Sequence, residues 1–182
     1  MARALTGDSD PITRGSAIAA LVRLKAATGN DFDSALRDGA PAVRQRALRL
    51  LVCTETDLDR AAAVLAHLPD PDDGVTEVAA FVAGELFGPP SEAPLDVVVA
   101  LSAVATTHTD ALCRESAVAA MGAIGHPAGL AAVLAGCQDK ATVRRRAVIA
   151  LAAFDGAEVD EMLDRLLEDR DLQVRQAAED LR

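Results

Sequence analysis

The chain has 182 residues, of which 51% are hydrophobic and 2% aromatic, with no Trp or Tyr, and its formal charge at pH 7 is −10. A chain of this length can bury a substantial core, and an average charged fraction of 25% argues against disorder. The acidic balance and the missing base-stacking side chains argue against nucleic-acid binding, because such proteins neutralise phosphates with Lys and Arg. A core built from Leu, Val, Ile and Ala favours closely packed helices.

No part of the sequence predicts export or membrane insertion. Residues 1–10 are polar and are expected to form an N-terminal tail, and no apolar run approaches the roughly 20 residues that span a bilayer. The cysteines are odd in number and far apart, which is typical of reduced thiols and not of a disulfide framework. We therefore predict a cytoplasmic protein with no membrane partner, in which Cys53, Cys113 and Cys137 are small buried hydrophobes.

A pentapeptide of the form Val-Arg-x-x-Ala recurs along the chain. Three full copies and three looser ones begin, in chain order, at Thr13, Val43, Val75, Cys113, Val143 and Val174. Their last residues are separated by 30, 32, 38, 30 and 31 positions and are Ala17, Ala47, Ala79, Ala117, Ala147 and Ala178. The single long step contains Gly88-Pro89-Pro90-Ser91, which we interpret as a loop insertion.

Each copy is expected to open a helix, here called a B helix. Apolar residues after Val43 recur at helical spacing, and the Asp, Pro and Gly residues before each copy can cap a helix or preset its first φ. The predicted B helices lie near residues 11–27, 41–53, 75–87, 111–124, 141–154 and 172–182. A second helix, the A helix, is predicted before each turn, near residues 32–37, 57–68, 93–106, 128–137 and 158–167.

Because one pair of helices cannot bury both of its faces, neighbouring pairs must stack. The pattern resembles HEAT repeats, and the period of about 30 residues with Asp-x-x-x-Val-Arg-x-x-Ala resembles the subgroup called PBS-lyase HEAT-like repeats. The resemblance covers residues 11–182, although Thr76 replaces the Arg in one copy. It implies an all-α fold, an armadillo-like α-α superhelix: a right-handed solenoid of about five to six helical hairpins. Residues 11–182 would then form a single domain.

An Arg placed just after a turn can bond to the turn Asp of its own repeat or of the adjacent one. The resemblance implies an Asp–Arg ladder along the stack, a structural role and not an anion-binding one. The expected members are Asp38, Arg44, Arg114, Asp139, Arg144, Asp171 and Arg175. Exposed pairs of this kind add only about 0–1 kcal/mol each, so such a ladder would matter for register more than for stability.

The resemblance also implies that the B helices line a concave surface. Rotating by 100° per residue from Val43 gives the outward positions. The candidate partner-binding residues at these positions are Gln45, Arg49, Glu77, Phe81, Glu115, Arg145 and Ile149. Phe81 and Ile149 would be apolar anchors ringed by polar groups, unless the helix phase is off by one residue and Phe81 belongs to the core.

Charge is distributed unevenly along the chain. Residues 56–110 hold ten acidic and one basic side chain, whereas residues 1–55 and 111–156 each carry a net charge of +2. The run from Arg144 to Arg146 is the densest basic spot. It is either one ladder arginine with two solvated neighbours or a local site for an acidic partner or a phosphate group.

No catalytic or metal-binding pattern emerges. His67, His108 and His126 are far apart and none precedes a Glu, unlike the His-Glu dyads of di-iron HEAT-repeat hydroxylases. Zinc-type cysteine spacing, a calcium loop, a Gly-rich phosphate loop and a nucleophile elbow are all missing from the sequence. We therefore expect no metal, no cofactor and no catalytic residue.

The sequence predicts a non-enzymatic adaptor or regulatory scaffold that binds another protein through its concave B-helix face. One alternative is a phycobilin-lyase-like or other small-molecule-handling enzyme, which would show an enclosed pocket with converging polar groups. A second is a relative of the HEAT-like DNA glycosylases, which the acidic balance disfavours. A third is a protein that associates with itself through an exposed end helix.

Overall fold

A computed structural model describes residues 1–55, 57–89 and 92–182. The described residues are 71% helical and contain no strand, which confirms the all-α prediction. Pro90 and Ser91 of the expected loop insertion lie outside the described residues.

The chain divides into two compact units, Met1–Val82 and Ala83–Arg182. The first unit contains η1 (Ala2–Gly7), α1 (Pro11–Arg23), α2 (Gly29–Leu36), α3 (Pro41–Leu51) and α4 (Arg60–His67). Helix α5 (Asp73–Phe87) crosses the boundary between the units. The second unit contains α6 (Leu95–Thr107), α7 (Ala111–Ile124), η2 (Pro127–Gly129), α8 (Leu130–Gly136), α9 (Ala141–Leu151), α10 (Ala157–Leu166) and α11 (Leu172–Glu179). A single repeat domain over residues 11–182 remains a prediction.

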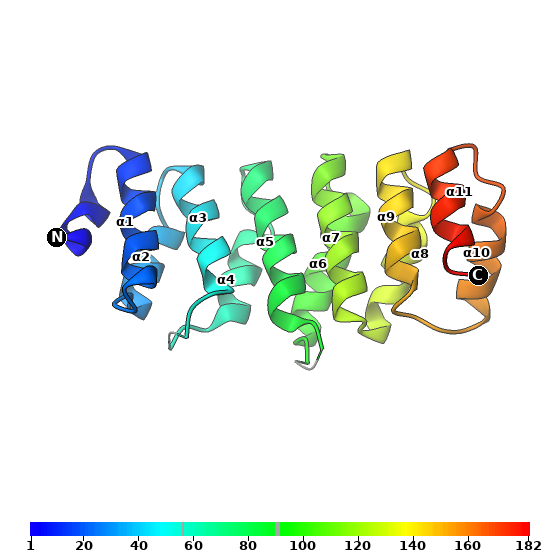
Figure 1. Ribbon diagram of the computed structural model, residues 1–182, viewed down its shortest axis with the longest axis horizontal. Coiled ribbons are helices and arrows are strands. Elements are labelled where there is room, and N and C mark those ends of the chain that lie inside the picture. The colour runs from blue at the N-terminus through cyan, green and yellow to red at the C-terminus, as the bar shows by residue number, and fades with distance from the viewer. Residues whose placement is uncertain (56, 90–91) are drawn as a thin grey trace. The chain divides into compact units, whose positions relative to one another are not determined.

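The odd-numbered helices are the predicted B helices and the even-numbered helices are the A helices, as Figure 1 shows. In the first unit α1 packs against α3, and α2 covers both from the other layer. In the second unit α7 packs against α9 and α9 against α11, with α6, α8 and α10 in the A-helix layer. Each unit is therefore a two-layered stack of helical hairpins.

The turns supply the helix starts that their composition predicts. The Asp10 carboxylate accepts from the backbone N–H groups of Ile12 and Thr13 and so caps α1, and Pro41 stands in the first turn of α3. Thr28 and Asp31 form a capping box at the start of α2. Each of these short helices thus begins at a defined residue.

The alanines of the repeated pentapeptide lie where helices touch. All six are buried, with exposures of 4% or less. Small residues bring the helices of the second unit close together: a Cβ atom added at Gly122 on α7 would lie 2.7 Å from the Cα atom of Ala150 on α9. The high alanine content is therefore a packing requirement, as the repeat predicts.

Two expectations about individual segments are corrected. Residues 2–7 are not a simple tail, because they form a 3-10 helix that packs against α1, and Arg3 in this helix donates to Asp31 on α2 at 2.9 Å. Cys113 and Cys137 are buried, as predicted, and burial raises the pKa of the Cys137 thiol to about 12. Cys53 is exposed, because it follows the last residue of α3 and lies outside the helix contacts.

No helix in the described part of the chain is both long enough and apolar enough to cross a membrane.

The close contact between α7 and α9 predicts opposite effects for two glycine substitutions. Gly122→Ala should lower the free energy of unfolding by about 1–2 kcal/mol, because overpacking exceeds the gain in helix propensity. Gly15→Ala on α1 is the matched control: its new Cβ would meet only the Arg46 side chain, at 3.9 Å, so stability should rise by about 0.5–1 kcal/mol. Urea unfolding of the two variants measures both effects, and equal changes would contradict this account of the packing.

Candidate functional site

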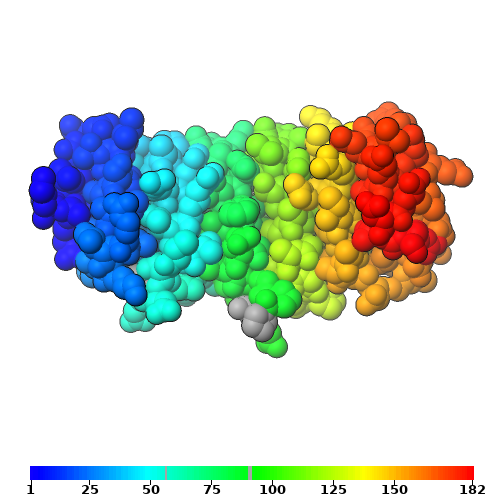
Figure 2. Space-filling view, in the orientation of Figure 1, coloured from blue at the N-terminus to red at the C-terminus, as the bar shows by residue number. Residues whose placement is uncertain are grey.

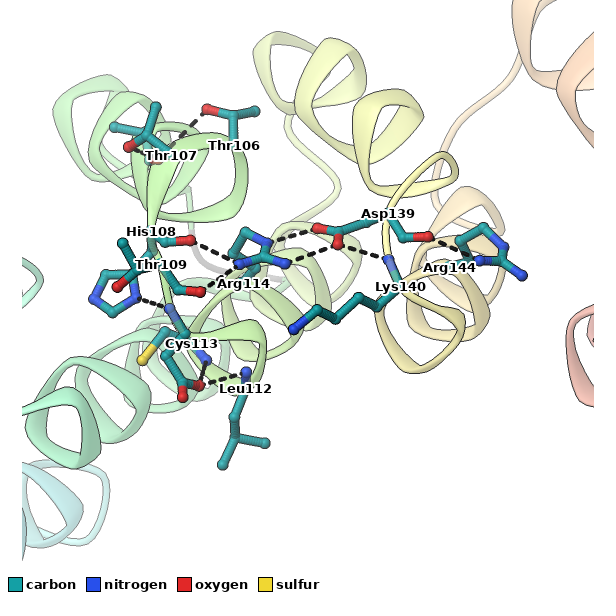
Figure 3. Close-up of polar contacts among 12 residues, drawn as sticks. Thr106, Thr107, His108, Thr109, Leu112, Cys113, Arg114, Asp139, Lys140 and Arg144 are labelled. Carbon is teal, nitrogen blue, oxygen red and sulfur yellow. Dashed lines mark hydrogen bonds and ion pairs between the residues drawn. The ribbon is translucent and has the colours of Figure 1, made fainter.

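The arginines of the repeated motif bridge successive turns. The Nε and Nη2 groups of Arg114 donate to the two carboxylate oxygens of Asp139, at 2.6 and 2.8 Å, while Nη1 donates to the backbone carbonyl of His108 at 2.7 Å (Figure 3). Arg144 repeats this arrangement with the carboxylate of Asp169 and the carbonyl of Asp139. One guanidinium therefore joins its own turn to the turn of the next repeat, using its planar set of donors.

The same bridges occur in the first unit. Arg14 binds the Asp38 carboxylate through two N–H···O contacts of 2.7 Å, and Arg44 binds Asp70 at 2.9 and 2.7 Å. Each aspartate is also held by its own turn, because one oxygen accepts a backbone N–H from one or two residues further on, as in the 2.8 Å bond from Ala40 to Asp38. These backbone hydrogen bonds hold each aspartate carboxylate in the orientation in which it accepts from the arginine.

These ion pairs are shielded from solvent, contrary to the expectation of exposed pairs. The four arginine side chains are between 6% and 19% exposed, and Arg144 as a whole residue is 5% exposed. Hydrogen bonds from Arg114 and Arg144 hold the pKa of the Asp139 and Asp169 carboxyls below the ordinary value, as Arg14 does for Asp38. Removing one partner of such a shielded pair would leave the other charge uncompensated, so we expect stability to be sensitive to substitution in the ladder.

The prediction that Asp171 belongs to the ladder is wrong. Asp171 caps α11 by accepting from the N–H groups of Gln173 and Val174, and Asp169 takes the expected ladder place, because a turn can hold one aspartate for the arginine and one for its own helix. Arg175 donates to the Asp169 carbonyl of its own turn.

Thr76 and His108 replace an Arg and an Asp of the pattern at successive repeats. Thr76 is buried and donates from its hydroxyl to the carbonyl of Asp70, which is the own-turn bond that an arginine makes elsewhere. The carbonyl of His108 still accepts from Arg114, as the equivalent Asp carbonyls do. The departures therefore change side-chain pairing but preserve the turn.

In the first unit, the candidate partner-binding residues lie on α3 and α5. Gln45 is half-buried and donates to Asp72 at 3.4 Å, Glu77 is half-buried, and Arg49 is exposed. Phe81 is 54% exposed, so the alternative that it belongs to the core is wrong. An exposed aromatic ring on an otherwise polar helix face is the feature expected of an apolar anchor.

In the second unit, Glu115, Arg145 and Ile149 are brought together around α9. The Arg146 guanidinium lies 3.5 Å from the Glu115 carboxylate, and Arg145 is exposed and donates to the side-chain oxygen of Gln173 at 2.9 Å. Ile149, one turn further along α9, is 46% exposed. With Arg144 buried in the ladder, the three consecutive arginines have three different surroundings.

These residues line two adjoining hollows on the B-helix surface of the second unit, the face of α9 and α11 that is turned toward the viewer in Figure 2. The smaller hollow, of about 160 Å³, includes Glu115, Arg145 and Gln173. The larger, of about 420 Å³, includes Arg145, Ile149 and Gln173 together with α11 residues. Both are open to solvent.

Three residues that complete these hollows, Gln173, Ala177 and Leu181, are not among the outward positions that the sequence predicts. Gln173 lies one residue before the Val that starts the repeated motif, so continuing the helical rotation one turn backward from Gln176 would have found it. Leu181 lies beyond the last residue of α11, where a helical rotation gives no direction.

The described residues offer no obvious metal centre. No group of three or more His, Cys, Asp or Glu side chains among residues 1–55, 57–89 and 92–182 is arranged to hold a metal ion. His67 is buried instead, with Nδ1 2.7 Å from the carbonyl oxygen of Ala63 and Nε2 2.9 Å from that of Leu36, so it ties α4 to α2.

Comparison with known proteins agrees with the repeat. Residues 98–181 match the family model described as HEAT repeats, the family that the repeated motif resembles. No curated protein sequence matches the chain.

Solved structures show the same fold at low identity. A crystal structure of an engineered protein matches with a TM-score of 0.69 and 18% identity, covering 98% of this chain and 92% of the other. A designed armadillo repeat protein in complex with the peptide (KR)4 matches with a TM-score of 0.70 and 14% identity, covering 99% of this chain and 96% of the other. At this level of identity, these matches show that the chain shares the all-helical repeat fold of these proteins.

Removing a ladder arginine should destabilise the protein far more than removing a surface arginine. Arg144→Ala leaves the buried Asp169 carboxylate without its cation and should lower the free energy of unfolding by about 3 kcal/mol. Arg146→Ala on the same helix removes a longer, more exposed pair and should cost about 0–1 kcal/mol. Chemical denaturation measures both, and similar losses would contradict the proposed role of the ladder.

The ladder also predicts how stability depends on pH. Because the pKa of Asp139 is lower in the folded protein than its unfolded value of about 3.9, its contribution is complete above about pH 5 and is lost as the pH falls toward the folded-state pKa. Asp139→Asn should therefore be less stable than the wild type at pH 7 but lose less stability on acidification.

Urea midpoints at pH 7, 5, 4 and 3 give this comparison. The control is Asp155→Asn, an exposed residue before α10, which should follow the wild-type curve. If the urea midpoints of Asp139→Asn depended on pH as those of the wild type do, the ion pair between Asp139 and Arg114 would contribute nothing to acid sensitivity.

Proposed function

We propose that the protein is a non-enzymatic adaptor or scaffold that binds another protein through the outward face of its B helices. The main support is that Phe81 and Ile149, at equivalent positions of α5 and α9, are 54% and 46% exposed. Large apolar side chains surrounded by polar groups are the usual anchors of protein interfaces.

The arginines near these anchors support the same proposal. Arg49 holds the position on α3 that Phe81 holds on α5, and Arg145 precedes Ile149 by one turn of α9. Both arginines are exposed, and no carboxylate of the described residues forms an ion pair with either. In a chain of net charge −10, such cations are available to a partner.

The hollows and the comparisons fit a macromolecular ligand. The hollows beside α9 are open to solvent, as a surface that binds a protein segment requires. A designed armadillo repeat protein of the same fold is in complex with a peptide, which supports a peptide or protein as ligand. The odd number and wide spacing of the cysteines favour a reducing compartment, so we place the adaptor in the cytoplasm.

Capture of partners from lysate by two matched triple variants tests this proposal. Arg49→Glu, Phe81→Ala and Arg145→Glu together should abolish partner capture, because they remove anchors and reverse charge on the B-helix face. The control triple, Arg37→Glu, Val99→Ala and Arg165→Glu, combines two arginine-to-glutamate changes with the truncation of an apolar side chain, on or beside A helices at exposed positions. It should capture as the wild type does.

Quantitative mass spectrometry of the captured proteins, with circular dichroism to show that each variant is folded, gives the result. Equal capture by both folded variants would overturn the assignment of the B-helix face.

A further inference from the structure

Resting on the proposed function, we propose that the groove between α9 and α11 binds a short extended segment of a partner protein that carries an acidic residue two positions from a large apolar residue. The groove is the hollow of about 420 Å³ described above. Four features of its lining carry the inference: a cation, an apolar floor, two amide side chains and a carboxylate.

Arg145 is the cation. Its neighbours in sequence are already engaged, since Arg144 is buried against Asp169 and Arg146 lies beside Glu115. Arg145 donates one N–H to Gln173, at 2.9 Å, which orients the guanidinium and leaves further donors exposed. A carboxylate is the group that matches this planar set of donors.

The floor of the groove is apolar. Ala152 and Ala177 leave space between the helices, and Ile149 and Leu181, which are 46% and 36% exposed, line the same hollow. Covering this surface with an apolar side chain removes it from water, which favours binding. Ile149 follows Arg145 by four residues, or about 6 Å along the helix axis.

This separation fits an extended ligand. Side chains two residues apart in an extended chain point the same way and lie about 6.6 Å from each other. An extended backbone also leaves its N–H and C=O groups unpaired, and the amides of Gln173 and Gln176 in the groove provide both donors and acceptors for them. The backbone N–H and C=O groups of a helical segment are already hydrogen-bonded within the helix, so they would not pair with these amides.

The remaining charges set the position of the acidic residue. Asp171, at the edge of the adjoining smaller hollow, accepts from the N–H groups that start α11, and Glu115 lies beside Arg146. Asp180 lines the groove and forms no ion pair among the described residues. An acidic side chain is therefore attracted at the Arg145 end and repelled beside Asp180, where a basic or neutral residue fits.

The test uses the full chain and a displayed library of random 12-residue peptides. Wild-type protein should enrich peptides with Asp or Glu two positions from Leu, Ile, Met or Phe. An enriched peptide, synthesised with a fluorophore, should bind Arg145→Glu about tenfold more weakly in fluorescence anisotropy, because a charge-assisted bond worth at least about 1.4 kcal/mol is lost.

Replacing the acidic residue of that peptide with Lys should restore binding to Arg145→Glu and weaken binding to the wild type. Ile149→Ala should weaken the original peptide, and Arg165→Glu, on α10, should leave it unchanged. All variants should keep the wild-type thermal midpoint, since Arg145, Ile149 and Arg165 are exposed.

Three outcomes would overturn the inference. The first is no enrichment of the acidic-apolar pattern. The second is enriched peptides that depend on Arg49 and Phe81 but bind Arg145→Glu as well as the wild type, which would leave the proposed function intact. The third is a wild-type dimer in light scattering that Ile149→Asp converts to monomers, which would place a second copy of the chain in the groove.

Discussion

A single guanidinium that contacts two consecutive turns is the constraint on which the rest of the structure depends. The helices are short, between 7 and 15 residues, and isolated helices of this length are marginal in water. Arg114 and Arg144 fix the distance and the rotation between neighbouring hairpins by binding one turn through its carbonyl and the next through its carboxylate. With the turns fixed, contacts as close as that between Gly122 and Ala150 become possible.

The ladder and the buried alanines leave several side chains on the outward face of the B helices exposed, among them Arg49, Phe81 and Ile149. The ladder lies at the turns and the anchor alanines lie between helices, so residues such as Phe81 and Ile149 contribute little to folding where they are. Burying them against a partner gains free energy that the folded protein alone does not obtain. In the proposed complex, the exposed Arg145, which donates to Gln173, would add specificity through charge complementarity with the partner.

The sequence predicts the fold well because the same motif, with the same helix pattern around it, recurs at a nearly constant spacing. The spacing of Ala17, Ala47 and Ala79 indicates helix pairs of one kind, and all three are buried as the repeat requires. The aspartates of the ladder are harder to predict from the sequence. Asp169 and Asp171 flank the same Arg170, and only the geometry shows that Asp169 is the one that binds Arg144. The exposure of Cys53 and the place of Leu181 depend on how the chain leaves a helix, which periodicity does not describe.

The two-sided arginine contact has a consequence for how such a chain can change in length. A complete repeat presents an aspartate to the repeat before it and an arginine to the repeat after it. Asp139, for example, accepts from Arg114, and Arg144 of the same repeat donates to Asp169. A duplicated hairpin would therefore meet a compatible neighbour at both of its joints. At Thr76 and His108 the sequence departs from the pattern of Arg and Asp, so a copy inserted between them would meet different side chains.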